Sequence, residues 1–261
     1  MAENPYAAPR TRVEDVPTSL PDGDFIPEGR SVPAGNGWRW IADAWGFMSG
    51  QRWTFIGVFL LLMLMQLVAQ FVPLIGPLVA LLFYPVLLGG FVLGCEAVRQ
   101  GQRLEVGHLF AGFQRNMGKL VALGGLWLVF GLVAGIIMVA FIGTSLVPLM
   151  SNPQPTPEEA LSFLLPMLLA MLIVMALSLP VSMAMLFAMP LIVLRDSDVL
   201  PALKTSFFAC LKNILPFLVW SLAIFALSFL AAIPLFLGYI LLAPVSMVSL
   251  YMAYRDIFHE V

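Results

Sequence analysis

The segment Pro85-Val86-Leu87-Leu88 has two counterparts later in the chain, Pro180-Val181-Ser182-Met183 and Pro244-Val245-Ser246-Met247. Each lies within a long apolar run that ends in an arginine. These arginines are Arg99, Arg195 and Arg255. A phrase that recurs at corresponding places indicates an internally duplicated structural unit, and the nature of that unit decides the fold.

The composition identifies lipid as the solvent of this unit. The chain is 61% hydrophobic and 11% charged, whereas soluble domains carry roughly 25% charged residues. No Asp, Glu, Lys or Arg occurs in four windows, and each window is longer than the about 20 residues that one helical pass needs. These windows are 53–95, 120–157, 160–194 and 213–254.

Turn residues and the distribution of Lys and Arg divide these windows into six predicted membrane spans. Prolines and glycine at 71–77, and Pro234, divide the first and last windows into two spans each. The window 160–194 could hold one long kinked pass or two short ones. One pass places all 13 Lys and Arg on one side, as the positive-inside rule favours. The predicted spans are 53–72, 78–98, 120–147, 160–194, 213–232 and 235–254.

An amphipathic segment precedes each pair of spans. Apolar residues recur at helical spacing near 40–48, 106–117 and 199–211, with charges on the other face. Such helices suit the headgroup layer. The sequence therefore predicts an all-α polytopic bundle of three parallel repeats, 39–100, 104–195 and 198–258, each an in-plane helix followed by two spans. The expected register aligns Gly46-Phe47, Gly112-Phe113 and Ser206-Phe207.

The amino-terminal segment differs from the rest. Residues 1–37 combine six prolines and four glycines with interspersed charges, too few apolar residues to offset the entropy of ordering. We expect a disordered cytoplasmic tail over 1–37 and a single membrane domain over 38–261.

Two kinds of residue are candidates for shaping the spans. Pro85, Pro180 and Pro244 are expected to kink the inward spans, either to shape packing or to line a shared cavity. Gly90 with Gly94, and Gly131 with Gly135, have the spacing that lets helix backbones approach closely in lipid.

The polar candidates are few. Glu96 and Arg99, three residues apart where a span leaves the bilayer, form the best candidate for a special site or for a helix-end ion pair. Gln66 and Gln70 are the strongest polar groups inside the spans, and interhelical hydrogen bonding is the simplest expectation for them. Basic residues on the in-plane helices are placed to contact anionic lipid at the inner leaflet. They are Arg52, Arg115, Lys119, Lys204 and Lys212.

A family resemblance agrees with this architecture. The stretch 84–90, continuing through Arg99 to Gly112-Phe113, resembles the diagnostic stretch of a group of bacterial polytopic membrane proteins. That group includes YciC-like proteins and the membrane domain of some glycerophosphodiester phosphodiesterases. Residues 202–213, with a central Ser206, are similar to the group's second signature. The resemblance covers about 39–258 and implies a bacterial inner-membrane location, with no reaction or catalytic residues.

The sequence offers no recognisable catalytic constellation. It has two histidines, two cysteines and no His-Glu-x-x-His motif, so we expect no enzyme, no metal and no cofactor. The leading hypothesis is a multi-pass inner-membrane protein with both termini cytoplasmic, acting in membrane organisation, lipid handling or a membrane complex. Its expected partners are membrane lipids and either another membrane protein or further copies of itself, not nucleic acid. The alternative is a small-solute or lipid transporter with a cavity between repeats.

Overall fold

The computed structural model describes residues 24–151 and 156–260, and this part of the chain is helical apart from one isolated β-bridge. The helices are α1 (Asn36–Phe47), α2 (Arg52–Ala69), α3 (Ile75–Arg99), the 3₁₀ helix η1 (Val106–Phe110), α4 (Ala111–Gln114), α5 (Met117–Ser151), α6 (Pro157–Leu186), α7 (Ala188–Arg195), α8 (Val199–Lys212), α9 (Ile214–Ala232) and α10 (Tyr239–Phe258). The all-α class predicted from the composition is therefore correct.

Six helical segments are long and apolar enough to cross a membrane, which confirms the predicted number of spans. They are Arg52–Ala69, Ile75–Arg99, Met117–Gly143, Leu161–Arg195, Ile214–Ala232 and Tyr239–Phe258. The fourth segment combines α6 and α7, so the window that sequence alone left ambiguous forms one long pass. This is a multi-pass membrane protein.

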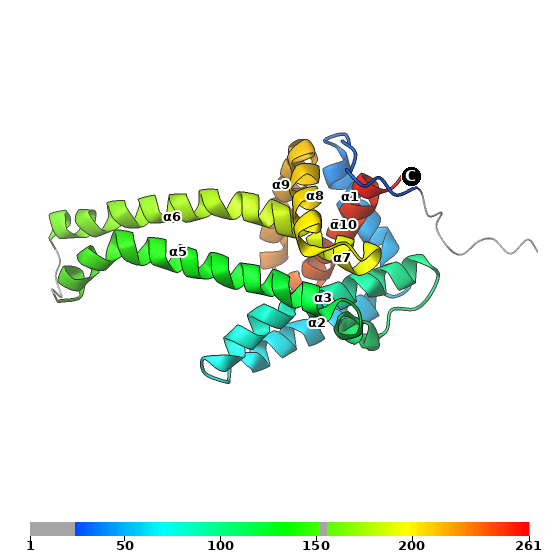
Figure 1. Cartoon of the computed structure of the whole chain (residues 1–261), viewed down its shortest axis with the longest axis horizontal. Coiled ribbons are helices and arrows are strands. Elements are labelled where there is room, and N and C mark those ends of the chain that lie inside the picture. The colour runs from blue at the N-terminus through cyan, green and yellow to red at the C-terminus, as the bar shows by residue number, and fades with distance from the viewer. Residues whose placement is uncertain (1–23, 152–155, 261) are drawn as a thin grey trace, which may run out of the picture.

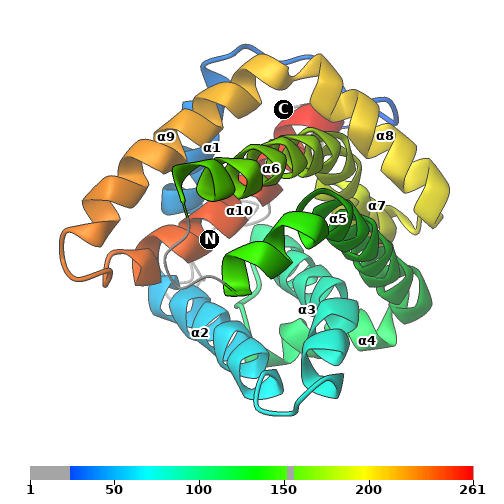
Figure 2. The same cartoon turned by 90° about the vertical axis from the view of Figure 1, so that its left-hand side faces the viewer.

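The spans form three hairpins, α2–α3, α5–α6 and α9–α10, whose outer ends spread apart from a common base (Figures 1 and 2). The α5–α6 hairpin projects farthest, because α5 has 35 residues and extends for about 50 Å at about 1.5 Å per residue. None of the most apolar window of α5 is buried within the chain, against 44% for α3 and α10. Lipid rather than protein therefore covers the outer parts of the hairpins.

The three amphipathic segments lie at the base. There α1 packs against α9 and α10, η1 and α4 pack against α3, and α8 packs against α6 and α7. Each keeps large apolar side chains exposed, for example Trp45, Phe110 and Phe208. The second segment differs from the expected continuous helix over 106–117, since it is a 3₁₀ turn followed by one short helix that ends at Gln114.

Close packing at the base depends on small residues. A Cβ added to Gly112 would lie 2.1 Å from the Val86 carbonyl oxygen, and one added to Gly90 would lie 2.2 Å from the Leu109 carbonyl oxygen. Gly94 likewise faces the Leu104 side chain at 2.6 Å. Gly90 and Gly94 thus bring α3 against η1 and the segment before it, rather than against another span.

Other expectations about small residues differ from the structure. Added Cβ atoms at Gly131 and Gly135 would meet nothing within 4 Å among the described residues, so this spacing mediates no packing within the described chain. Gly46 is also open, whereas Ala44, two positions earlier, is fully buried. The predicted alignment of Gly46 with Gly112 is therefore wrong, because the face of α1 that turns inward is the one that carries Ala44.

Helices α6 and α7 are separated by a break at Phe187. The buried Ser206 hydroxyl of α8 accepts a hydrogen bond from the Phe187 backbone N–H (2.9 Å) and donates one to the Met183 carbonyl (2.7 Å). It thereby replaces the helical bond that would join these two groups. The break lies seven residues beyond the exposed Pro180, the expected kink, while Pro85 and Pro244 are buried within continuous helices.

Replacing Ser206 with alanine is expected to lower the free energy of unfolding by about 1–3 kcal/mol, the cost of leaving buried backbone groups without their partner. Unfolding in mixed detergent micelles at increasing SDS fraction measures the loss. Ser178→Ala is the matched control, because the Ser178 hydroxyl bonds only the Met175 carbonyl of its own helix turn, at 2.8 Å. Equal stability of the two variants would contradict the assigned role of Ser206.

The amino-terminal residues of the described chain correct the expected tail. Residues 24–35 cross the base as an extended strap, in which the Ile26 N–H bonds the Phe258 carbonyl and Phe25 forms a β-bridge with His259. Buried Gly29 has a positive φ of 63° and contacts Ile257. Tertiary contacts thus order a polar segment whose composition predicted disorder up to residue 37. The expectation for residues 1–23 lies outside the described residues.

Candidate functional site

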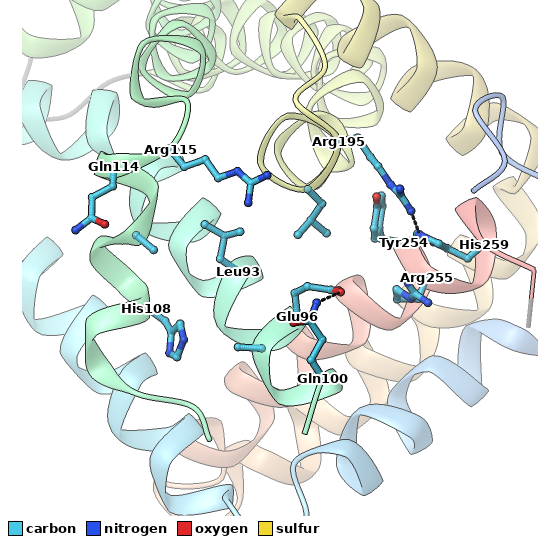
Figure 3. A pocket seen from close by; sticks show the side chains of 13 residues that line it. Leu93, Glu96, Gln100, His108, Gln114, Arg115, Arg195, Tyr254, Arg255 and His259 are labelled. Carbon is cyan, nitrogen blue, oxygen red and sulfur yellow. Dashed lines mark hydrogen bonds between the residues drawn. The ribbon is translucent and has the colours of Figure 1, made fainter. Parts of the chain in front are cut away.

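A cavity of about 490 Å³ lies at the base, where the inner ends of the hairpins meet (Figure 3). Four parts of the chain form its wall: the last turns of α3, the segment η1–α4, the end of α7 and the end of α10. The residues that line it are Leu93, Glu96, Ala97, Gln100, His108, Ala111, Gln114, Arg115, Leu194, Arg195, Tyr254, Arg255 and His259.

The wall of this cavity is cationic. Arg115 follows α4, Arg195 ends α7 and Arg255 lies in the last turn of α10, so three guanidinium groups approach from three elements. One carboxylate, Glu96, also lines the cavity. Three positive charges and one negative charge give a formal excess of +2 when the two histidines are neutral.

The carboxylate belongs to the ion pair that the sequence singled out. Arg99 Nε donates to Glu96 Oε1 at 3.0 Å, Gln100 Nε2 donates to the same oxygen at 3.1 Å, and the Tyr251 hydroxyl donates to Glu96 Oε2 at 2.6 Å. Arg99 is only 5% exposed. Three donors therefore engage the Glu96 carboxylate, and none of them is an arginine of the cavity wall.

Arg195 is held in place by the strap and by α10. Its Nη2 lies 2.7 Å from His259 Nε2, and its guanidinium lies over the Phe25 ring at 4.2 Å from the centroid. Because arginine only donates, this histidine nitrogen is the unprotonated acceptor. Sequence reasoning missed Phe25 and His259, since no local pattern links residue 25 to residue 259.

The recurring arginines Arg99, Arg195 and Arg255 all line cavities at this base, though not the same one. Arg195 and Arg255 line the first cavity, and Arg99 and Arg255 line a second one of about 510 Å³ between α1 and α10. Arg255 lines both cavities, and Glu96 of the first cavity accepts hydrogen bonds from Arg99 and Tyr251 of the second. Six of the twelve residues that line the second cavity are charged, and Trp40, Phe47 and Met252 are among its apolar residues.

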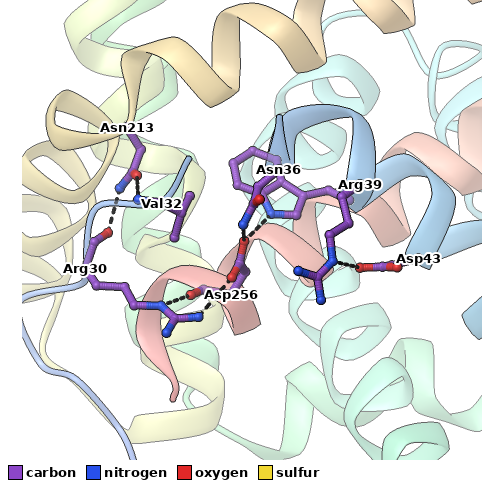
Figure 4. Close-up of polar contacts among 8 residues, drawn as sticks. Arg30, Val32, Asn36, Arg39, Asp43, Asn213 and Asp256 are labelled. Atoms are coloured by element: carbon purple, nitrogen blue, oxygen red, sulfur yellow. Dashed lines mark hydrogen bonds and ion pairs between the residues drawn. The ribbon is translucent and has the colours of Figure 1, made fainter. Parts of the chain in front are cut away.

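Asp256 joins the strap and α1 to the end of α10 (Figure 4). Its carboxylate accepts hydrogen bonds from Arg30 Nη2 (3.0 Å), Asn36 Nδ2 (2.7 Å) and Trp40 Nε1 (2.8 Å). Asn213 likewise bonds the backbone of Arg30 and Val32. These contacts join residues at least 181 positions apart in the chain, so no local pattern in the sequence indicated them.

The remaining predicted polar residues lie elsewhere. Gln66 lies on α2 and Gln70 directly follows its end, and Gln70 Nε2 is 3.5 Å from the Gln66 carbonyl oxygen. Ser228 and Ser246 donate to carbonyls one turn earlier in their own helices. None of these residues, and none of Pro85, Pro180 and Pro244, lines either described cavity.

The side chains that line the cavity at the base are suited to binding an anion. Among residues 24–151 and 156–260 there is no group of three or more His, Cys, Asp or Glu arranged to hold a metal ion. Both cysteines are buried, and burial raises the pKa of the Cys210 thiol to about 12. Guanidinium groups that converge on a partly enclosed space suit an anion, above all a phosphate or a carboxylate.

Comparison with known proteins gives a family and no activity. No curated protein and no solved structure matches the chain. A family described as Domain of unknown function (DUF7847) matches residues 44–254. The resemblance to the YciC-like group, and the bacterial origin it implies, stay predictions. Because the match covers most of the chain, including five of the spans whole and the cavity residues as far as Tyr254, the protein belongs to the DUF7847 family of unknown function.

Proposed function

We propose that this chain is a non-enzymatic, six-span membrane protein that binds the anionic headgroups of lipids where its three hairpins join, and so handles or organises lipid at that face of the membrane. The observation that supports the proposal is the cavity lined by Arg115, Arg195 and Arg255. These arginines lie next to the ends of membrane spans, the depth at which lipid phosphates occur.

The surroundings of the cavity support a position in the headgroup layer. The amphipathic helices expose apolar side chains beside cations, as in Trp45, which lies under the Arg52 guanidinium at 4.2 Å, and Phe208 on the same helix as Lys204. Aromatic and basic residues of this kind are typical of the membrane interface. Each cation there attracts anionic lipid by about 1 kcal/mol.

The pattern of helix contacts favours three parallel repeats as the frame of this site. Two of the amphipathic segments pack on the second span of the hairpin before them: η1–α4 packs on α3, and α8 packs on α6–α7. The first amphipathic helix, α1, packs on the last span, α10, which closes the arrangement into a ring. A ring built in this way brings the span-terminal arginines to one face. With the basic residues on the cytoplasmic side, we propose that this face is the inner leaflet of a bacterial inner membrane and that both termini are cytoplasmic.

The transport alternative lacks comparable support. Both described cavities lie at the base, and the intramembrane glutamines and serines line neither of them. The serine hydroxyls that bond carbonyls of their own helices do not form a polar route across the membrane. Binding at one face is therefore the function that the geometry favours.

Replacing Arg115 with glutamine tests the proposal. The Arg115 guanidinium makes no hydrogen bond or ion pair with other described residues, so its removal is expected to leave the fold intact. Loss of one cation should weaken binding of anionic lipid by about 1 kcal/mol, roughly fivefold in Kd. Titration of the purified protein in nanodiscs, with increasing anionic lipid in a phosphatidylcholine background, measures the change.

The matched control is Arg103→Gln. Arg103 is an exposed cation in the loop before η1, and it lines neither described cavity. The two variants lose the same charge at the same face. Equal weakening by both would mean that the lipid responds to overall surface charge and would exclude a headgroup site in the cavity.

A further inference from the structure

We propose that the cavity at the hairpin junction is built for a terminal phosphate, a phosphomonoester dianion, rather than for the phosphodiester of most phospholipids. This inference rests on the anion site proposed above and names the ligand class that it prefers. The phosphomonoester can belong to a lipid headgroup or to a soluble molecule, because the recognised chemistry is the same.

The charge of the wall fits a dianion. Arg115, Arg195 and Arg255 supply three positive charges, and Glu96 is the one carboxylate in the wall. Because Arg195 donates to His259 Nε2 at 2.7 Å, that histidine is neutral in this arrangement. The excess of +2 matches a phosphomonoester, which carries about −1.5 to −2 near neutral pH, and exceeds the single charge of a diester.

Acidic groups beyond the wall are engaged elsewhere. Asp196 lies within electrostatic range of Arg115, but Lys119 Nζ bonds its carboxylate at 3.1 Å, and this hydrogen bond keeps the pKa of Asp196 below its ordinary value. Asp256 lies next to Arg255 in sequence and accepts bonds from Arg30, Asn36 and Trp40. Both carboxylates therefore have hydrogen-bond donors of their own outside the cavity wall.

The arrangement of donors also fits a terminal phosphate. The three guanidiniums come from three directions, after α4, at the end of α7 and at the end of α10, and a phosphomonoester presents three terminal oxygens where a diester presents two. Tyr254, which is fully buried, places its hydroxyl beside Arg195 in the same wall (Figure 3). This hydroxyl has no hydrogen-bond acceptor among the described residues, so it can donate to a phosphate oxygen.

The test compares two lipids in the same protein. Nanodiscs of phosphatidylcholine receive either phosphatidic acid, a monoester, or phosphatidylglycerol, a diester, and binding to the full chain is titrated at pH 5 and pH 8. At pH 8 the monoester should bind about tenfold more tightly, the value of one additional charge-assisted hydrogen bond. The preference should shrink at pH 5, because the second ionisation of a phosphomonoester lies near pH 6.

The ratio of the two affinities compares the two lipids in the same protein at each pH. Only phosphatidic acid gains a charge between pH 5 and pH 8, because a phosphomonoester has a second ionisation near pH 6 and a phosphodiester has none. A ratio near one at both pH values would overturn the inference and leave the proposed function standing. Absence of binding by both lipids would instead refute the proposed function.

Two further measurements test which side chain contributes to the preference and whether the phosphomonoester belongs to a lipid or to a soluble molecule. Tyr254→Phe should lower the preference for the monoester about threefold, as loss of one partly offset hydrogen bond predicts, and the control Tyr239→Phe, at the outer start of α10, should not. Inorganic phosphate at millimolar concentration serves as competitor. Displacement of phosphatidic acid by phosphate would assign a soluble phosphomonoester as the ligand, and resistance to displacement would assign the lipid. An unchanged preference in Tyr254→Phe would contradict the role of the hydroxyl.

Discussion

Replacing Glu96 with alanine should lower the free energy of unfolding by about 3 kcal/mol or more, because breaking a buried ion pair strands the remaining charge. Arg99 is 5% exposed, and two of its nitrogens donate to Glu96 Oε1. The Tyr251 hydroxyl would lose its acceptor at the same time. The expected result is a large shift of the unfolding midpoint to lower SDS fraction in mixed micelles.

Two other variants make the Glu96 result specific. Glu96→Gln keeps an oxygen for the Arg99 and Tyr251 donors and should lose clearly less stability than Glu96→Ala. Glu28→Ala removes an exposed carboxylate of the strap and should change stability by less than about 0.5 kcal/mol, as surface substitutions usually do. If all three variants unfolded together, the Glu96–Arg99 pair would be a weak surface ion pair and not a support of the cavity wall.

Replacing Gly112 with alanine should be comparably severe. Its Cβ would lie 2.1 Å from the Val86 carbonyl oxygen and 3.2 Å from the Gly90 nitrogen, both backbone atoms that cannot move aside as a flexible side chain does. Overpacking of this kind costs about 1–3 kcal/mol and occasionally more, and we expect the upper end. The same unfolding titration measures it, and the reduced contact of α4 with α3 should also weaken lipid binding, because Arg115 follows α4.

The control for this substitution is Gly46→Ala. Gly46 lies in α1 and has open space where a Cβ would be placed. Alanine there should stabilise the helix by about 0.5–1 kcal/mol, since glycine in a helix interior is unfavourable. A loss of stability at Gly46 equal to that at Gly112 would show that the contacts at the base are not those described here.

The fold class and the number of spans followed from the sequence because they depend on local quantities. Apolar length, the positions of prolines in turns and the side on which basic residues fall are all read within about 20 residues, and they identified six spans and three amphipathic segments. The Glu96–Arg99 pair was visible for the same reason, since its partners lie one turn apart on one helix. The recurring proline phrases lie in the second span of each hairpin, and the break between α6 and α7 occurs at Phe187 and not at Pro180.

The candidate site could not be read in this way, because its parts are far apart in the chain and ordinary in composition. Arg115, Arg195 and Arg255 resemble any basic residues at a membrane boundary until η1–α4, α7 and α10 bring them around one cavity. The strap over residues 24–35 reads as a polar tail, yet Asp256 and Asn213 order it through backbone and side-chain bonds.

The sequence by itself indicated that lipid is the solvent and that six helices are long and apolar enough to cross it, because hydropathy acts on each segment independently. The tertiary structure decided which arginines face one another, which glycines support contacts and where the hairpins diverge. Those outcomes depend on close fit between surfaces that are distant in the chain, and a pattern of residue types along one segment does not specify the fit.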